Sequence, residues 1–183
     1  MSLPNFITIL RILLVPLTVW LIIGGRYELA FIAFISAGIS DGVDGYLARR
    51  LNLQTELGAY LDPIADKALL VSIYVALGML LFIPDWLVIM VVTRDVLIVG
   101  AVILSWLLDK PLRMAPLMTS KVNTAGQILL AGLALGLLAL DMEIPWLMNA
   151  GIYGVAFLTV SSGALYMRAW LRHMANGKTS ASP

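Results

Sequence analysis

The chain contains no cysteine and a single histidine, His173, among its 183 residues. The absence of cysteine excludes disulfide bonds, thiolate metal sites and a cysteine nucleophile. One histidine in a polar C-terminal segment supplies neither the imidazole ligands of most zinc sites nor the base of a buried Ser-His-Asp triad. Any chemistry of this chain must therefore depend on carboxylates, hydroxyl groups, Arg and Lys.

Charge is also scarce. Only 13% of the residues are Asp, Glu, Lys or Arg, whereas 61% are hydrophobic. A soluble domain has about 25% charged residues to cover its surface, so this composition excludes a soluble globule. The net charge of +1 lacks the basic surplus of a nucleic-acid-binding protein, and we expect no nucleic-acid partner.

Six apolar stretches, each about as long as a membrane-spanning helix, occupy nearly the whole chain. They are separated by Gly, Pro and charged residues and run approximately over 5–23, 28–50, 57–82, 85–108, 122–140 and 145–171. We therefore predict an all-α integral membrane protein with six transmembrane helices. The short connections leave room for one domain over residues 1–174 and a disordered polar tail over 175–183.

The Lys and Arg residues between these stretches predict an orientation. Arg26 alone lies outside when the N-terminus is placed inside, and the cations that then face the cytoplasm are Arg49, Arg50, Lys110, Arg113, Lys121, Arg168, Arg172 and Lys178. Positive residues mark cytoplasmic loops, so both termini are predicted to be cytoplasmic, in a bacterial inner membrane. Trp86 and Trp146 begin helices on the outer side, either as interfacial aromatic residues or through ordinary packing.

Four aspartates remain inside two neighbouring predicted helices. Asp41 and Asp44 are three residues apart, and Asp62 and Asp66 are four apart, so each pair lies on one face of its helix. Four carboxylates without partners would cost on the order of 10 kcal/mol in a membrane. Divalent cations remove this cost, and ligands that are all oxygen favour Mg²⁺, Mn²⁺ or Ca²⁺.

Small residues and one cation accompany the acids. Gly45, Ala48 and Gly58 lie on the same helix faces, where they either allow close helix packing or open a slot for a ligand. Arg49 offers a guanidinium suited to phosphate oxygens, or alternatively a salt bridge to Asp44. An ion or proton transporter would also keep acids in the membrane, but along a path across it. Here the acids lie at the cytoplasmic end of one helix and the start of the next, which favours a site facing the cytoplasm.

The spacing of these residues resembles a known signature. The fixed positions are Asp41, Asp44, Gly45, Ala48, Arg49, Gly58, Asp62 and Asp66, with eight residues between Arg49 and Gly58. This pattern is similar at every fixed position to that of the CDP-alcohol phosphatidyltransferases. The resemblance implies six transmembrane helices, usually a homodimer, and enzymatic transfer of a phosphatidyl group from CDP-diacylglycerol to an alcohol, with release of CMP.

The same resemblance implies roles for individual residues. Two divalent cations, Mg²⁺ or Mn²⁺, would be held by Asp41, Asp44, Asp62 and Asp66. The implied catalytic residues are Asp62 and Asp66, and Asp66 would also be the general base for the acceptor hydroxyl. The start of the chain also resembles family members, so the cytidine diphosphate would be bound by Asn5, Thr8, Asp44, Gly45, Ala48, Arg49 and Gly58.

The resemblance covers approximately residues 4–135, and the last helix is too uniformly hydrophobic to add to it. Arg94-Asp95-Val96 and the segment from Ser120 to Thr124 are more similar to cardiolipin synthases than to phosphatidylglycerophosphate synthases. This favours phosphatidylglycerol as the acceptor, with glycerol-3-phosphate as the alternative. The cations nearest to an acceptor phosphate are Arg94, Arg113 and Lys121, which are equally explained as positive-inside residues or as contacts to membrane lipids.

Overall fold

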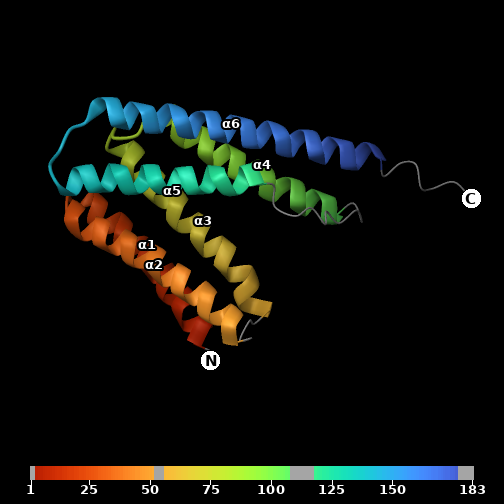
Figure 1. The fold of residues 1–183 in the computed structure, drawn as a ribbon, viewed down its shortest axis with the longest axis horizontal. Coiled ribbons are helices and arrows are strands. Elements are labelled where there is room, and N and C mark those ends of the chain that lie inside the picture. Colours follow the sequence, from red (N-terminus) through yellow and green to blue (C-terminus); the bar gives the residue numbers. More distant parts are fainter. Residues whose placement is uncertain (1–2, 52–55, 108–117, 177–183) are drawn as a thin grey trace, which may run out of the picture.

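The computed structural model describes the backbone of residues 3–51, 56–107 and 118–176. Within these ranges it describes the side chains of residues 13–40, 67–101, 104, 107 and 118–172. The described backbone forms six α-helices and no strand (Figure 1), with bounds α1 Leu3–Ile23, α2 Tyr27–Leu51, α3 Glu56–Met79, α4 Asp85–Leu107, α5 Met118–Ala139 and α6 Pro145–Asn176. Each predicted apolar stretch corresponds to one of these helices, so the all-helical prediction is confirmed.

Three of the helices end in the same way. After α1, α3 and α5 the chain turns through a residue with positive φ, at Gly25 (70°), Leu81 (62°) and Asp141 (52°). In each turn the next amide donates to a carbonyl five residues earlier, as from Arg26 to Leu21 at 2.9 Å. This is the Schellman arrangement, which satisfies the last carbonyls of a helix and reverses the chain direction.

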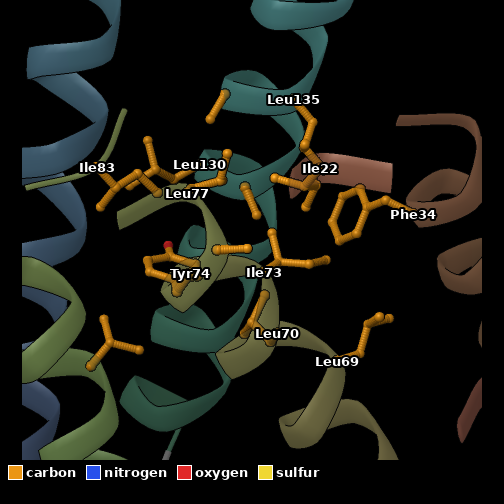
Figure 2. Close-up of a cluster of buried hydrophobic side chains, with 14 of the residues drawn as sticks. Ile22, Phe34, Leu69, Leu70, Ile73, Tyr74, Leu77, Ile83, Leu130 and Leu135 are labelled. Carbon is orange, nitrogen blue, oxygen red and sulfur yellow. The ribbon is translucent and has the colours of Figure 1, made fainter. Parts of the chain in front are cut away.

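Helix α3 lies at the centre of the packing. It contacts α1, α4 and α5, while α2 packs against α1 and α5, and α6 packs against α4 and α5. Figure 2 shows Ile73, Tyr74 and Leu77 of α3 among apolar side chains from neighbouring helices, including Ile22 of α1 and Leu135 of α5. The core therefore forms around the second half of α3.

The outer surface of the described helices is strongly apolar. Large side chains such as Trp20, Ile89, Leu129 and Phe157 are each more than half exposed. A surface of this kind suits contact with lipid tails better than with water. Two of the described segments, Met118–Ala139 and Pro145–Arg172, are long and apolar enough to cross a membrane.

The six spans, the cytoplasmic termini and the single domain over 1–174 stay predictions, and the tail of residues 177–183 lies outside the described chain. Helix α6 itself continues to Asn176. Of the two tryptophans expected at the outer side, Trp86 stacks on Tyr153 with a centroid distance of 6.2 Å, and Trp146 is 72% exposed.

Candidate functional site

Both pairs of acids lie on continuous helices. Asp41 and Asp44 belong to α2, and Asp62 and Asp66 belong to α3. The helical spacing that places each pair on one face is therefore present in the backbone. The side chains of residues 41–66 lie outside the described part of the chain.

The chain connection brings the two acid-bearing helix ends together. Only residues 52–55 separate the end of α2 from the start of α3, so those ends are at most about 18 Å apart. Figure 1 shows the start of α1 at the same end of the molecule as the end of α2 and the start of α3. The backbone thus gathers at one end all the segments predicted to bind the metals and the nucleotide.

The donor chemistry of this end fits hard divalent cations. Its four acids are carboxylates without any thiol or imidazole nearby in sequence, which is the ligand set that Mg²⁺ or Mn²⁺ takes. Among the side chains that the structure describes, no group of three or more acidic or histidine residues could hold a metal ion. The predicted nucleotide-binding residues also have side chains outside the described set, namely Asn5, Thr8, Asp44, Gly45, Ala48, Arg49 and Gly58.

A cluster of three charges, of which Arg94 and Asp95 are buried, begins one residue beyond the signature. The Lys67 ammonium of α3 lies 2.7 Å from Oδ2 of Asp95 on α4. Oδ1 of the same carboxylate accepts a hydrogen bond of 2.6 Å from the Arg94 guanidinium. Arg94 and Asp95 are both buried, and Asp95 thus has one cation on each of its oxygens. Buried charges are tolerated in this way because each has an opposite charge and hydrogen bonds in place of water.

Arg94 extends this cluster to two further helices. Its Nη2 donates to the hydroxyl of Ser120 on α5 at 2.7 Å and to that of Ser162 on α6 at 2.6 Å. The guanidinium therefore connects α4, α5 and α6 through one planar group. We call Lys67, Arg94, Asp95, Ser120 and Ser162 the Arg94 cluster.

Buried polar contacts continue along α5 next to the Arg94 cluster. Thr159 of α6 donates to Oδ1 of Asn123 at 3.0 Å. The Tyr74 hydroxyl donates to the backbone carbonyl of Gln127 at 3.1 Å. The side-chain amide nitrogens of Asn123 and Gln127 and Nε of Arg94 have no hydrogen-bond partner among the described residues, so this region retains buried donors.

The structure describes two of the three cations predicted to meet the acceptor. Arg94 is buried, with its guanidinium bonded within the Arg94 cluster. Lys121 follows Ser120 in α5 but is exposed. Arg113 lies outside the described residues. The carboxylate of the next residue, Asp95, offsets the Arg94 charge.

Sequence reasoning missed the contribution of α6. This helix added nothing to the family resemblance in sequence, but its Ser162 and Thr159 bond to residues of α4 and α5. The available signal was a polar stripe: Thr159, Ser162 and Tyr166 have the spacing of one helix face. The pairing of Lys67 with Asp95 was not foreseen from the sequence.

Comparison with known proteins extends across nearly the whole chain. The family model for CDP-alcohol phosphatidyltransferases matches residues 1–168, well beyond the limit near 135 expected from motifs. A cardiolipin synthase (CMP-forming)/mitochondrial hydrolase fusion protein of Schizosaccharomyces pombe is 35% identical over 182 residues, covering 90% of this chain and 30% of that protein. Human cardiolipin synthase (CMP-forming) is 35% identical over 150 residues, covering 73% of this chain and 50% of its own length.

A third relative, which matches almost from end to end, is named as a phosphatidylglycerophosphate synthase and not as a cardiolipin synthase. A protein of Mycobacterium tuberculosis named as a probable phosphatidylglycerophosphate synthase is 31% identical over 189 residues, with coverage of 99% of this chain and 87% of the relative. The chain thus resembles proteins of both names at similar identity.

Proposed function

Because the chain belongs to the CDP-alcohol phosphatidyltransferase family, we propose that it makes phospholipid by transferring a phosphatidyl group from CDP-diacylglycerol to the hydroxyl of an acceptor alcohol. The observation that carries this proposal is the gathering, at one end of the helical backbone, of both acid pairs of the signature. In the reaction, the acceptor oxygen bonds to the lipid-side phosphorus, and the bond from that phosphorus to CMP breaks.

The residues at this end have separate tasks in the proposed reaction. Two divalent cations, Mg²⁺ or Mn²⁺, would be held by the four aspartates and would supply charge stabilisation for the diphosphate and the departing CMP. Asp66 accepts the proton of the attacking hydroxyl. Gly45, Ala48 and Gly58 leave space for the nucleotide, and Arg49 hydrogen-bonds to its phosphate oxygens. Asn5 and Thr8, at the start of α1, complete the nucleotide-binding residues.

We further propose phosphatidylglycerol as the acceptor, which makes cardiolipin the product. Glycerol-3-phosphate carries a dianionic phosphate that needs free cations close to the reacting groups. Arg94 and Lys67, two cations close to the signature, are both paired with Asp95. Phosphatidylglycerol has only an internal phosphodiester and makes a smaller demand for positive charge.

Glycerol-3-phosphate remains the second candidate for two reasons. The relative that aligns over 87% of its own length bears the name of a phosphatidylglycerophosphate synthase. The Lys67 side chain is also 38% exposed, so a small anionic acceptor could reach its ammonium group.

The acceptor is identified by its product. Purified protein is supplied with CDP-diacylglycerol and Mn²⁺, together with either phosphatidylglycerol or glycerol-3-phosphate, and the lipid formed is identified by mass spectrometry. We expect CMP and cardiolipin from the first mixture. Phosphatidylglycerophosphate from the second mixture alone would overturn the choice of acceptor. If neither mixture releases CMP, the proposed phosphatidyl transfer is contradicted, and the alternative of an ion or proton transporter is favoured.

The proposal includes the setting of the enzyme. We place it in a bacterial inner membrane as six spans with both termini cytoplasmic, as a homodimer whose active site faces the cytoplasm. The apolar outer surface and the two segments long enough to cross a membrane support a membrane location.

A further inference from the structure

The ion pair between Lys67 and Asp95 acts on the same helix turn as the signature. Lys67 directly follows Asp66 within the unbroken helix α3. In an α-helix, neighbouring residues point about 100° apart around the axis. A helix turn that is held at Lys67 cannot rotate without also moving Asp66. Any anchor on Lys67 therefore helps to set the direction in which the second acid pair points.

The anchor itself is rigidly supported. Asp95 is buried and bonded through both oxygens, to Lys67 at 2.7 Å and to Arg94 at 2.6 Å. Arg94 is held in turn by Ser120 and Ser162. The Asp95 carboxylate is therefore held by Arg94 of α4, which is itself bonded to α5 and α6. The contact from Asp95 to Lys67 connects these three helices to α3.

The ion pair also connects two parts of the bundle. Helix α3 contacts α1, α4 and α5. Figure 1 follows α3 from the end it shares with α2 to its crossing with α5. Residue 67 lies between the acid pair and the buried core around Ile73 and Tyr74. The pair thus fixes α3 at the point where the core ends and the predicted site begins.

From this geometry we infer that Asp95 is a positioning residue for the reaction: through Lys67 it holds α3 so that Asp62 and Asp66 present their carboxylates to the metal site. The inference rests on the proposed function. Asp95 does not touch the substrate; it acts only through Lys67. Residues that orient metal ligands typically change metal affinity or activity about 10–100-fold when they are replaced.

The experiment compares three variants of the full-length enzyme: Asp95→Asn, Lys67→Met and the double variant. Direct Mn²⁺ binding is measured by electron paramagnetic resonance, alongside kcat, the KM for CDP-diacylglycerol and thermal unfolding. We expect each single variant to weaken Mn²⁺ binding and to lower kcat about 10–100-fold. KM should change little, and the double variant should be no worse than Asp95→Asn alone, because that substitution already breaks the contact to Lys67. Lys67→Arg, which keeps the charge, should recover most of the loss.

Thr159→Val is the matched control. It removes a buried hydrogen bond to Asn123 between α5 and α6, outside the contact to α3. It should lower the unfolding temperature without weakening Mn²⁺ binding.

The outcomes distinguish the inference from the proposed function. Wild-type Mn²⁺ affinity in a folded Lys67→Met variant, or equal effects of Thr159→Val and Asp95→Asn on binding, would overturn the positioning role. If Asp95→Asn does not fold, the pair Lys67→Met and Lys67→Arg decides the question, because Lys67 is partly exposed. A wild-type protein that neither binds Mn²⁺ nor releases CMP would instead overturn the proposed function.

Discussion

The buried guanidinium of Arg94 is an expensive group to keep in an apolar bundle, and its surroundings explain why it is tolerated. Its hydrogen bonds are accepted by the Asp95 carboxylate and by the hydroxyl groups of Ser120 and Ser162. Hydrogen bonds to charged groups are worth about 1.5–3 kcal/mol each. The stability of this region should therefore depend on hydroxyl groups that are minor features in the sequence.

Replacing Ser162 with Ala should destabilise the protein by about 1–3 kcal/mol, because the Arg94 guanidinium loses an acceptor that water cannot easily replace. Thermal unfolding in detergent measures the change. The control is Ser161→Ala, one residue earlier in α6, since Ser161 is outside the Arg94 cluster. Equal unfolding temperatures for the two variants would show that the hydroxyl at 162 contributes nothing.

The acids of the signature make a second prediction about single residues. Asp41→Asn and Asp62→Asn should each lower the rate of CMP release about a thousandfold or more, because each removes a metal ligand. Asp85→Asn is the control, since this exposed acid begins α4 rather than belonging to the signature. Retention of more than a tenth of the wild-type rate in either signature variant would be incompatible with the metal site.

Three turns at helix ends each contain one residue with a positive φ. The three Schellman turns place Gly25, Leu81 and Asp141 at positive φ, a conformation that costs residues other than glycine about 1–2 kcal/mol. Glycine occupies only the first of the three turns. Leu81 is 83% exposed, so burial of its side chain does not offset the free-energy cost of its positive φ.

Gly25→Ala should therefore destabilise the protein by about 1 kcal/mol, since φ at this position is 70°. Gly38→Ala makes the same chemical change inside α2, where an added Cβ would meet no atom within 4 Å. It should be neutral or stabilising by up to about 1 kcal/mol, because alanine favours a helix interior. Opposite signs in the unfolding temperature are the expected result, and a loss of stability at both positions would contradict it.

At the scale of the whole molecule, the topology is open to a clean test because the chain has no cysteine. A single cysteine introduced at Glu143 should react with a membrane-impermeant maleimide in intact cells. One introduced at Ser180 should react only after the membrane is permeabilised. This pattern follows from the excess of Lys and Arg on the side of the termini. The reverse pattern would invert the orientation and move the proposed site to the outer face.

Much of the architecture follows from local properties of the sequence. The predicted stretches 57–82 and 145–171 correspond to α3, Glu56–Met79, and α6, Pro145–Asn176. Runs of apolar residues bounded by Gly, Pro and charge determine helices in this way because both signals act within a few residues. The spacing of the four aspartates is likewise a local property, and it sufficed to indicate the family that the comparison later showed.

The tertiary structure decided which polar groups meet. Arg94 bonds to hydroxyls that are 26 and 68 residues away in sequence, and no helical period predicts such a pairing. Those contacts depend on which faces of α3, α4, α5 and α6 pack together. From the sequence, Arg94 was a candidate cation for the acceptor, explained equally well as a positive-inside residue or a lipid contact. Its burial against Asp95, Ser120 and Ser162 makes it part of the scaffold, because a charge inside an apolar bundle binds the partners that packing brings to it.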